Sequence, residues 1–174
     1  SSHGYASTYP GPNLLTSPWL DLSGMAGTDL YISFSHSIET EPLWDRSWIQ
    51  YTVDGITWTD LGVLNDANGI NWYNEALYEH AAFDAGNYDD VTSVQYGLGT
   101  GPPASWTSND NGTTGAPGDF VPNGPTGYVY SQLKVTETSH AALVGASAVR
   151  FRYVAFSDAV SSFGGWAFDN FKLS

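Results

Sequence analysis

Apolar and polar residues alternate along several segments of this chain, a period-two pattern typical of half-buried β-strands. The clearest case runs from Leu30 to Ile38, where Leu30, Ile32, Phe34 and Ile38 alternate with Ser33, Ser35 and Ser37. His36 falls on the apolar face of this segment, so we expect a packed, hydrogen-bonded histidine rather than a metal ligand. The pattern therefore predicts a strand with one face in a hydrophobic core.

The same reasoning predicts further strands over residues 13–22 (interrupted at Ser17-Pro18), 48–53, 91–96, 128–136 and 149–156. In the last of these both alternating faces carry apolar groups, so we expect a central strand that is buried on both sides. Asp54-Gly55 lies between two alternating runs. This dipeptide predicts a β-hairpin with a two-residue loop, because both of its residues can take positive φ.

Three segments depart from the alternation. Residues 74–82 fit at most a short helix with Asn74 as its N-cap, or an irregular aromatic-rich edge. Residues 97–127 contain eight glycines and five prolines, which predicts a long ordered or functional loop rather than an ordinary connection. Asp169 and Asn170 interrupt the final apolar run, and strands disfavour both residue types. That interruption points to a turn, a metal site or a ligand site.

Composition supports an all-β protein. The chain of 174 residues has seven Trp, eleven Tyr and eight Phe together with 19 Gly and nine Pro, so large strand-forming side chains are separated by many turns. We expect one domain, residues 1–174, folded as a two-sheet antiparallel β-sandwich of the jelly-roll type. Trp48, Trp58 and Trp166 are expected in its core.

Charge excludes two classes of partner. The net charge of −13 with only five Lys and Arg argues against nucleic acids and anionic membrane surfaces, which require clustered cations. No run of apolar residues is long enough to span a bilayer. The absence of cysteine excludes disulfides, thiol catalysis and cysteine-based zinc sites.

Two acidic clusters are candidate metal sites. Glu39, Glu41 and Asp45 repel one another with only Arg46 nearby, and a hard cation such as Ca²⁺ relieves such repulsion. Asp169 and Asn170 could complete this site, although a solvated acidic loop explains the cluster equally. The second cluster, Glu75, Glu79, His80, Asp84, Asp89 and Asp90, is more typical of a solvent-facing strip.

Aromatic residues near predicted loops are candidate glycan contacts, because flat rings stack on sugars while neighbouring polar groups bind hydroxyls. The candidates are Trp44, Trp72, Tyr73 and Trp106, with Tyr128 beside them. A sandwich also buries large aromatics, so we expect only one or two of these rings to be exposed. Nucleophilic catalysis has no recognisable motif here, and we expect a non-enzymatic protein.

Several segments resemble the MAM-like, carbohydrate-binding-type jelly-roll modules of secreted bacterial proteins. The segments are Leu15 to Gly24, Phe34 to Asp45, Ile49 to Trp58, and the closing Arg150 to Asn170. The resemblance implies a two-sheet jelly roll, often with a structural calcium. Carried onto this sequence, it assigns Glu41, Asp45 and Asp169 as ligands, with Glu39 and Asn170 as weaker candidates.

These observations favour a secreted, non-catalytic module that binds a glycan or a cell-surface protein and is stabilised by calcium. One alternative is a structural subunit of an extracellular filament or surface layer, in which copies of the chain complement one another's sheets. A polysaccharide-acting enzyme is a second alternative, because 18 acidic residues always allow a carboxylate pair.

Overall fold

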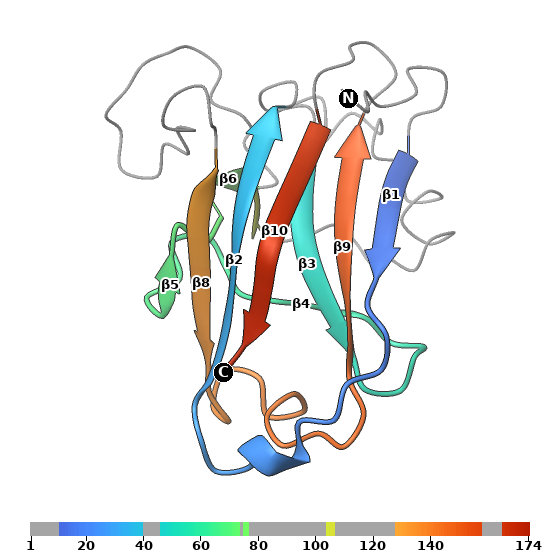
Figure 1. The fold of residues 1–174 in the computed structure, drawn as a ribbon, viewed down its shortest axis with the longest axis vertical. Helices are drawn as coiled ribbons and strands as arrows, with labels where there is room; N and C mark the ends of the chain where they lie inside the picture. Colours follow the sequence, from blue (N-terminus) through green and yellow to red (C-terminus); the bar gives the residue numbers. More distant parts are fainter. Residues whose placement is uncertain (1–10, 40–45, 74, 77–103, 107–127, 158–164) are drawn as a thin grey trace.

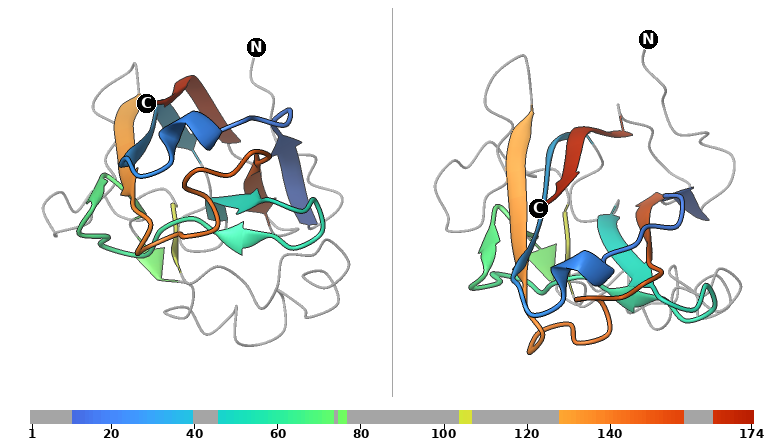
Figure 2. Two further views of the ribbon diagram at one scale, coloured as in Figure 1. Left: turned by 90° about the horizontal axis from the view of Figure 1, so that it is seen from below. Right: turned by 60° about the horizontal axis from the view of Figure 1, so that its bottom comes forward.

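The computed structural model describes residues 11–39, 46–73, 75–76, 104–106, 128–157 and 165–174. Within these ranges the chain forms two four-stranded antiparallel sheets and a two-stranded ribbon, and the sheets face each other in Figures 1 and 2. The helical element among these residues is one 3₁₀ turn, Ser23–Met25. The predicted two-sheet antiparallel sandwich is confirmed.

The first sheet has the order β10-β2-β8-β5. It contains β10 (Gly165–Leu173), β2 (Leu30–Glu39), β8 (Val129–Val135) and β5 (Gly69–Ile70). Neighbouring strands are antiparallel throughout. The strands predicted over 30–38 and 128–136 are therefore confirmed, and the chain's last strand lies beside one of its earliest.

The second sheet has the order β1-β9-β3-β4. It contains β1 (Gly11–Thr16), β9 (Arg150–Ser157), β3 (Arg46–Thr52) and β4 (Thr59–Asp60). Residues 151–155 of β9 are buried on both faces, and β9 lies between β1 and β3. The prediction of a central, doubly buried strand is confirmed.

The ribbon pairs β6 (Glu75–Ala76) with β7 (Ala104–Ser105). Because Glu75 and Ala76 are extended and paired to another strand, the short helix considered from Asn74 is wrong at its first turn. The rest of that segment, the strand predicted over 91–96 and most of the loop over 97–127 lie outside the described residues.

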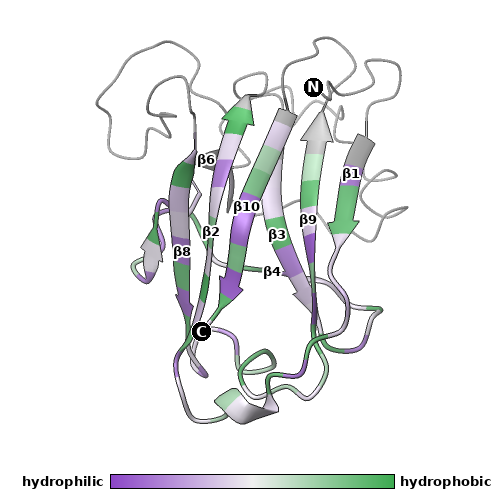
Figure 3. Ribbon diagram, in the orientation of Figure 1, coloured by the Kyte–Doolittle hydropathy of each residue, from purple (hydrophilic) through white to green (hydrophobic). Residues whose placement is uncertain are grey.

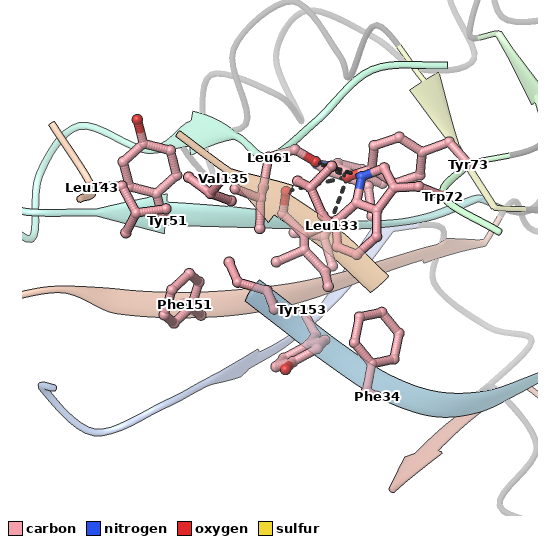
Figure 4. Close-up of a cluster of buried hydrophobic side chains, with 14 of the residues drawn as sticks. Phe34, Tyr51, Leu61, Trp72, Tyr73, Leu133, Val135, Leu143, Phe151 and Tyr153 are labelled. Carbon is pink, nitrogen blue, oxygen red and sulfur yellow. Dashed lines mark hydrogen bonds between the residues drawn. The ribbon is translucent and has the colours of Figure 1, made fainter. Parts of the chain in front are cut away.

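The core between the sheets is rich in aromatic rings, and Figure 4 shows part of it. Alternate residues of the strands are apolar in Figure 3, as expected for one face packed inward. Trp48 and Trp106 are fully buried, whereas Trp58 is half-buried and Trp166 packs against the core while partly exposed. His36 is buried and hydrogen-bonded to Ser131, which confirms its predicted packed state.

The β3–β4 hairpin differs from its prediction. Tyr51 pairs with Thr59, so the loop is longer than Asp54-Gly55, and of these two residues Gly55 alone has positive φ. Asp54 Oδ1 instead accepts hydrogen bonds from the backbone N–H groups of Ile56 (2.8 Å) and Thr57 (2.7 Å). These bonds lower the pKa of Asp54 to about 2. The aspartate side chain forms the turn, which the dipeptide pattern does not anticipate.

The interruption at Asp169-Asn170 is a β-bulge. The register between β10 and β2 shifts between Asp169 and Lys172, and Asn170 has a φ of 57°. The Asp169 carboxylate accepts a hydrogen bond from the Asn170 N–H at 2.7 Å. Asparagine tolerates this left-handed conformation better than most residues, so the polar pair here serves to bend an end strand of the described sheet.

Candidate functional site

The outer faces of the two sheets differ in exposure, and this difference locates the candidate site. On the β1-β9-β3-β4 sheet the outward side chains of Trp48, Gln50, Arg152 and Val154 are all at least 95% buried. On the β10-β2-β8-β5 sheet the outward residues are mostly half-buried or exposed. The second of these faces is therefore available to a ligand.

Two rows of side chains cross this open face. Strand register places Tyr130 of β8, Ser35 of β2 and Asp169 of β10 side by side. The next row contains Ile70, Gln132, Ser33 and Lys172. Adjacent strands are about 4.8 Å apart, so Tyr130 and Asp169 flank a strip about 10 Å wide over Ser35. We call the residues of these two rows the open face.

Tyr130 is the most prominent ring of the open face. It is 47% exposed, and its hydroxyl accepts a hydrogen bond from Gln132 Nε2 at 2.9 Å. Its backbone carbonyl accepts a second bond from Asn71 Nδ2 at 2.8 Å. Tyr128 precedes it by two positions and is 52% exposed. These bonds orient Tyr130 before any ligand arrives, which reduces the entropy lost on binding.

Charges on the open face are sparse and of both signs. Beside it, Lys134 of β8 donates to the carboxylate of its ion-pair partner Asp29 at 2.7 Å, and this hydrogen bond raises the pKa of Lys134. Asp169 and Lys172 are exposed on β10, with Ser33 and Ser35 beside them. The face combines one oriented ring with carboxylate, hydroxyl, amide and ammonium groups, so it offers both donors and acceptors.

The predicted glycan contacts Trp72, Tyr73 and Trp106 are wrong. All three rings are at least 96% buried, and the polar atom of each donates a hydrogen bond to a backbone carbonyl. Trp72 Nε1 and Tyr73 OH donate to Leu61 O, at 3.0 and 2.9 Å, and Trp106 Nε1 donates to Asn71 O at 3.0 Å. They are core residues. Trp44, the fourth candidate, lies outside the described residues.

The predicted calcium ligands are only partly described. Glu41 and Asp45 lie outside the described residues. Glu39 pairs with Gly165, whereas Asp169 pairs with Ser35, four positions along β2. At about 3.3 Å per residue these backbone positions are about 13 Å apart. Within the described ranges no three acidic or histidine side chains form a metal-binding group.

Sequence reasoning missed the most exposed described tryptophan, Trp19, which is 47% exposed. The Arg150 guanidinium lies 5.4 Å from its ring centroid, and Arg150 Nε donates to Ser17 O at 2.9 Å. The Ser-Pro-Trp sequence at an interrupted strand could have indicated this exposure, because proline favours the edge of a sheet. Tyr130 was missed because its regular strand position resembles that of a packing residue.

Comparison of the chain with protein families and with curated proteins gave no match. Among the described residues, no helix has the length and apolar character needed to cross a membrane. Of the second acidic cluster only the backbone of Glu75 is described, in β6. The open face is thus the best-defined candidate site, and its function is argued from its own residues.

Proposed function

We propose that this protein is a non-catalytic, extracellular glycan-binding module whose binding surface is the open face. The observation that carries the proposal is the row formed by Tyr130, Ser35 and Asp169. A sugar ring presents an apolar C–H face to Tyr130, while its hydroxyl groups bond to Ser35 and Asp169. Lectin domains commonly have a jelly-roll fold, but that is an analogy of fold and carries less weight than the residues.

The charge of the chain favours a neutral glycan. A net charge of −13 repels polyanions at long range, and Lys172 alone contributes an exposed ammonium to the two rows of the open face. We therefore expect neutral polysaccharides to bind better than uronic-acid or sulfated ones. Any binding of acidic polymers should strengthen with added salt, because salt screens the repulsion.

Substitution of Tyr130 tests the proposal. Tyr130→Ala should weaken binding to a neutral polysaccharide by about 2- to 10-fold, since stacking on an aromatic ring contributes about 0.5–1.5 kcal/mol. Tyr130→Phe should weaken it far less, because the stacking ring is retained. Binding is measured by affinity electrophoresis over a panel of soluble neutral and acidic polysaccharides.

Trp19→Ala is the matched control, because it removes an equally exposed ring that lies outside the open face, in the segment after β1. Equal loss of binding in both alanine variants, or no loss in Tyr130→Ala, would contradict the open-face proposal. Release of reducing sugar in the same samples, abolished by a carboxylate substitution, would identify an enzyme instead.

Calcium binding stays a prediction and is tested by thermal melting. We expect chelation to lower the melting temperature and Asp169→Ala to remove this sensitivity. Unchanged melting of the wild type in excess chelator would exclude a stabilising calcium ion altogether.

A structural subunit of a filament is the second candidate. It is favoured by β1, which is an end strand of the described sheet. Leu14 and Leu15 are 40% and 57% exposed, and consecutive strand residues point to opposite faces. An edge strand with exposed apolar groups is a template for strand addition. Size-exclusion chromatography with electron microscopy separates the candidates, since a strictly monomeric protein that binds glycans would exclude the filament.

A further inference from the structure

A chain of buried and partly buried hydrogen bonds runs beneath the open face, on the inner side of the same sheet. It starts at Trp166 of β10, whose Nε1 donates to His36 Nδ1 of β2 at 2.9 Å. His36 Nε2 lies 2.8 Å from the hydroxyl of Ser131 on β8. That hydroxyl donates to the carbonyl of Asn71, just after β5, at 2.8 Å. The bonds thus join all four strands of the sheet in order.

The directions of these bonds fix the proton on His36. An indole N–H can only donate, so Nδ1 of His36 must be the unprotonated acceptor. Nε2 therefore carries the proton and donates to Ser131, leaving the hydroxyl proton of Ser131 for the Asn71 carbonyl. A second proton on the imidazole would bind at Nδ1. There it would point at the N–H of Trp166 and break the hydrogen bond between Trp166 and His36.

The surroundings of His36 disfavour its charge. The side chain is fully buried, and the Phe34 and Trp106 rings lie 4.9 Å from the imidazole centroid. The Trp166 ring lies 6.0 Å away, and none of these three rings carries a charge. Burial accordingly lowers the pKa of His36 to about 3.

We propose that His36 is an acid-sensitive latch that releases β10 from the sheet when it becomes protonated. While β10 is paired with β2, the N–H of Trp166 opposes a second proton on Nδ1 of His36. Separation of β10 from β2 removes Trp166 and exposes the imidazole to water. β10 is also the element best suited to open. It is an end strand of the described sheet, and its bulge at Asn170 interrupts pairing with β2.

The direction of the pH effect follows from the two states. His36 titrates near 6.5 when exposed, so opening of β10 is favoured as the pH falls below that value, and the closed state is fully stable above it. Lowering the pH from 7.5 to 5 should increase the open population about 30-fold, the factor expected for a site that titrates 1.5 pH units above the final pH.

Hydrogen exchange read residue by residue by NMR tests the latch, without any glycan. Protection factors, which correct for the intrinsic effect of pH on exchange, should fall about 30-fold for β10 amides between pH 7.5 and pH 5. Amides of β3 and β9 in the other sheet should change far less. Loss of protection by all strands to the same extent would overturn the proposal, because it would indicate global unfolding.

His36→Gln is the key variant. Its amide can still accept from Trp166 and donate to Ser131 but cannot titrate near neutral pH, so the 30-fold change should disappear. His140→Gln is the matched control, because burial also lowers the pKa of His140 and its ring packs on Tyr51 rather than on β10. An unchanged pH response in His36→Gln would refute the latch.

Trp166→Phe provides a second test should His36→Gln not fold. This variant keeps an aromatic ring at β10 but removes the N–H that blocks Nδ1. Protonation of His36 in the closed state should therefore occur at a higher pH, which ¹⁵N shifts of its ring report, and by the same linkage the fall in β10 protection between pH 7.5 and pH 5 should be smaller than 30-fold. Wild-type behaviour in both measurements would contradict the proposed role of Trp166. Because Asp169 lies on β10, the latch would also make the open face dependent on pH.

Discussion

Gly62→Ala is expected to destabilise the protein by about 3 kcal/mol or more, through overpacking and backbone strain combined. Gly62 has a φ of 82°, and a β-carbon there would lie 2.8 Å from Cδ1 of Trp72 and 3.2 Å from Cδ2 of Leu133. Trp72 cannot easily move away, because its Nε1 is bonded to Leu61 O and its ring packs 5.1 Å from that of Trp106. Figure 4 shows Trp72 and Tyr73 converging on Leu61.

Chemical denaturation measures this loss, and Gly27→Ala separates its two causes. Gly27 has a similar φ of 74°, but a β-carbon there meets nothing within 4 Å. Its substitution should therefore cost only the conformational part, about 1 kcal/mol. Equal destabilisation of the two variants would show that the close approach of Trp72 to Gly62 contributes nothing.

Trp106→Ala should destabilise the fold by about 3–5 kcal/mol, the usual range for removal of a buried tryptophan. Its ring is fully buried, and its centroid lies within 6 Å of those of Phe34, His36, Trp72, Tyr73 and Trp166. The substitution also removes the bond from Nε1 to Asn71 O, which the Ser131 hydroxyl shares. Equilibrium unfolding measures the effect.

Trp19→Ala is the comparison variant for Trp106→Ala. Its ring is 47% exposed, so its loss should change the free energy of unfolding by about 1 kcal/mol at most. A Trp106→Ala protein with wild-type stability and no glycan binding would restore Trp106 as a ligand residue. The two variants therefore test whether Trp106 is a core residue and not a glycan contact.

The strands were predictable from sequence because alternation reports which face is buried. Leu30 to Ile38 shows this with serines at positions 33, 35 and 37, and β9 carries apolar groups on both faces, as a central strand does. These signals depend on residues near one another in the chain. They were sufficient for the fold class and for the state of His36.

The candidate site was less predictable, because exposure is set by distant parts of the chain. Trp72 and Trp106 follow polar, turn-rich sequence, yet they pack on each other and on Phe34. Conversely Tyr130 has a regular strand position, and only the assembled sheet shows that its face is open. Asp169 was predicted to bind calcium together with Glu41 and Asp45, which lie outside the described residues, and the assembled sheet places Asp169 beside Ser35.

The pairing of β10 with β2 also determines when this protein can fold. The bond between Trp166 and His36 joins residues 130 positions apart, and β1 pairs with β9 across a similar separation. Chains dominated by such distant pairings fold slowly, in milliseconds to seconds. During synthesis the sheet cannot close until the segment of β10 has emerged from the ribosome. Until then Phe34 and Tyr153 lack their β10 partners, and the nascent chain is most vulnerable to aggregation.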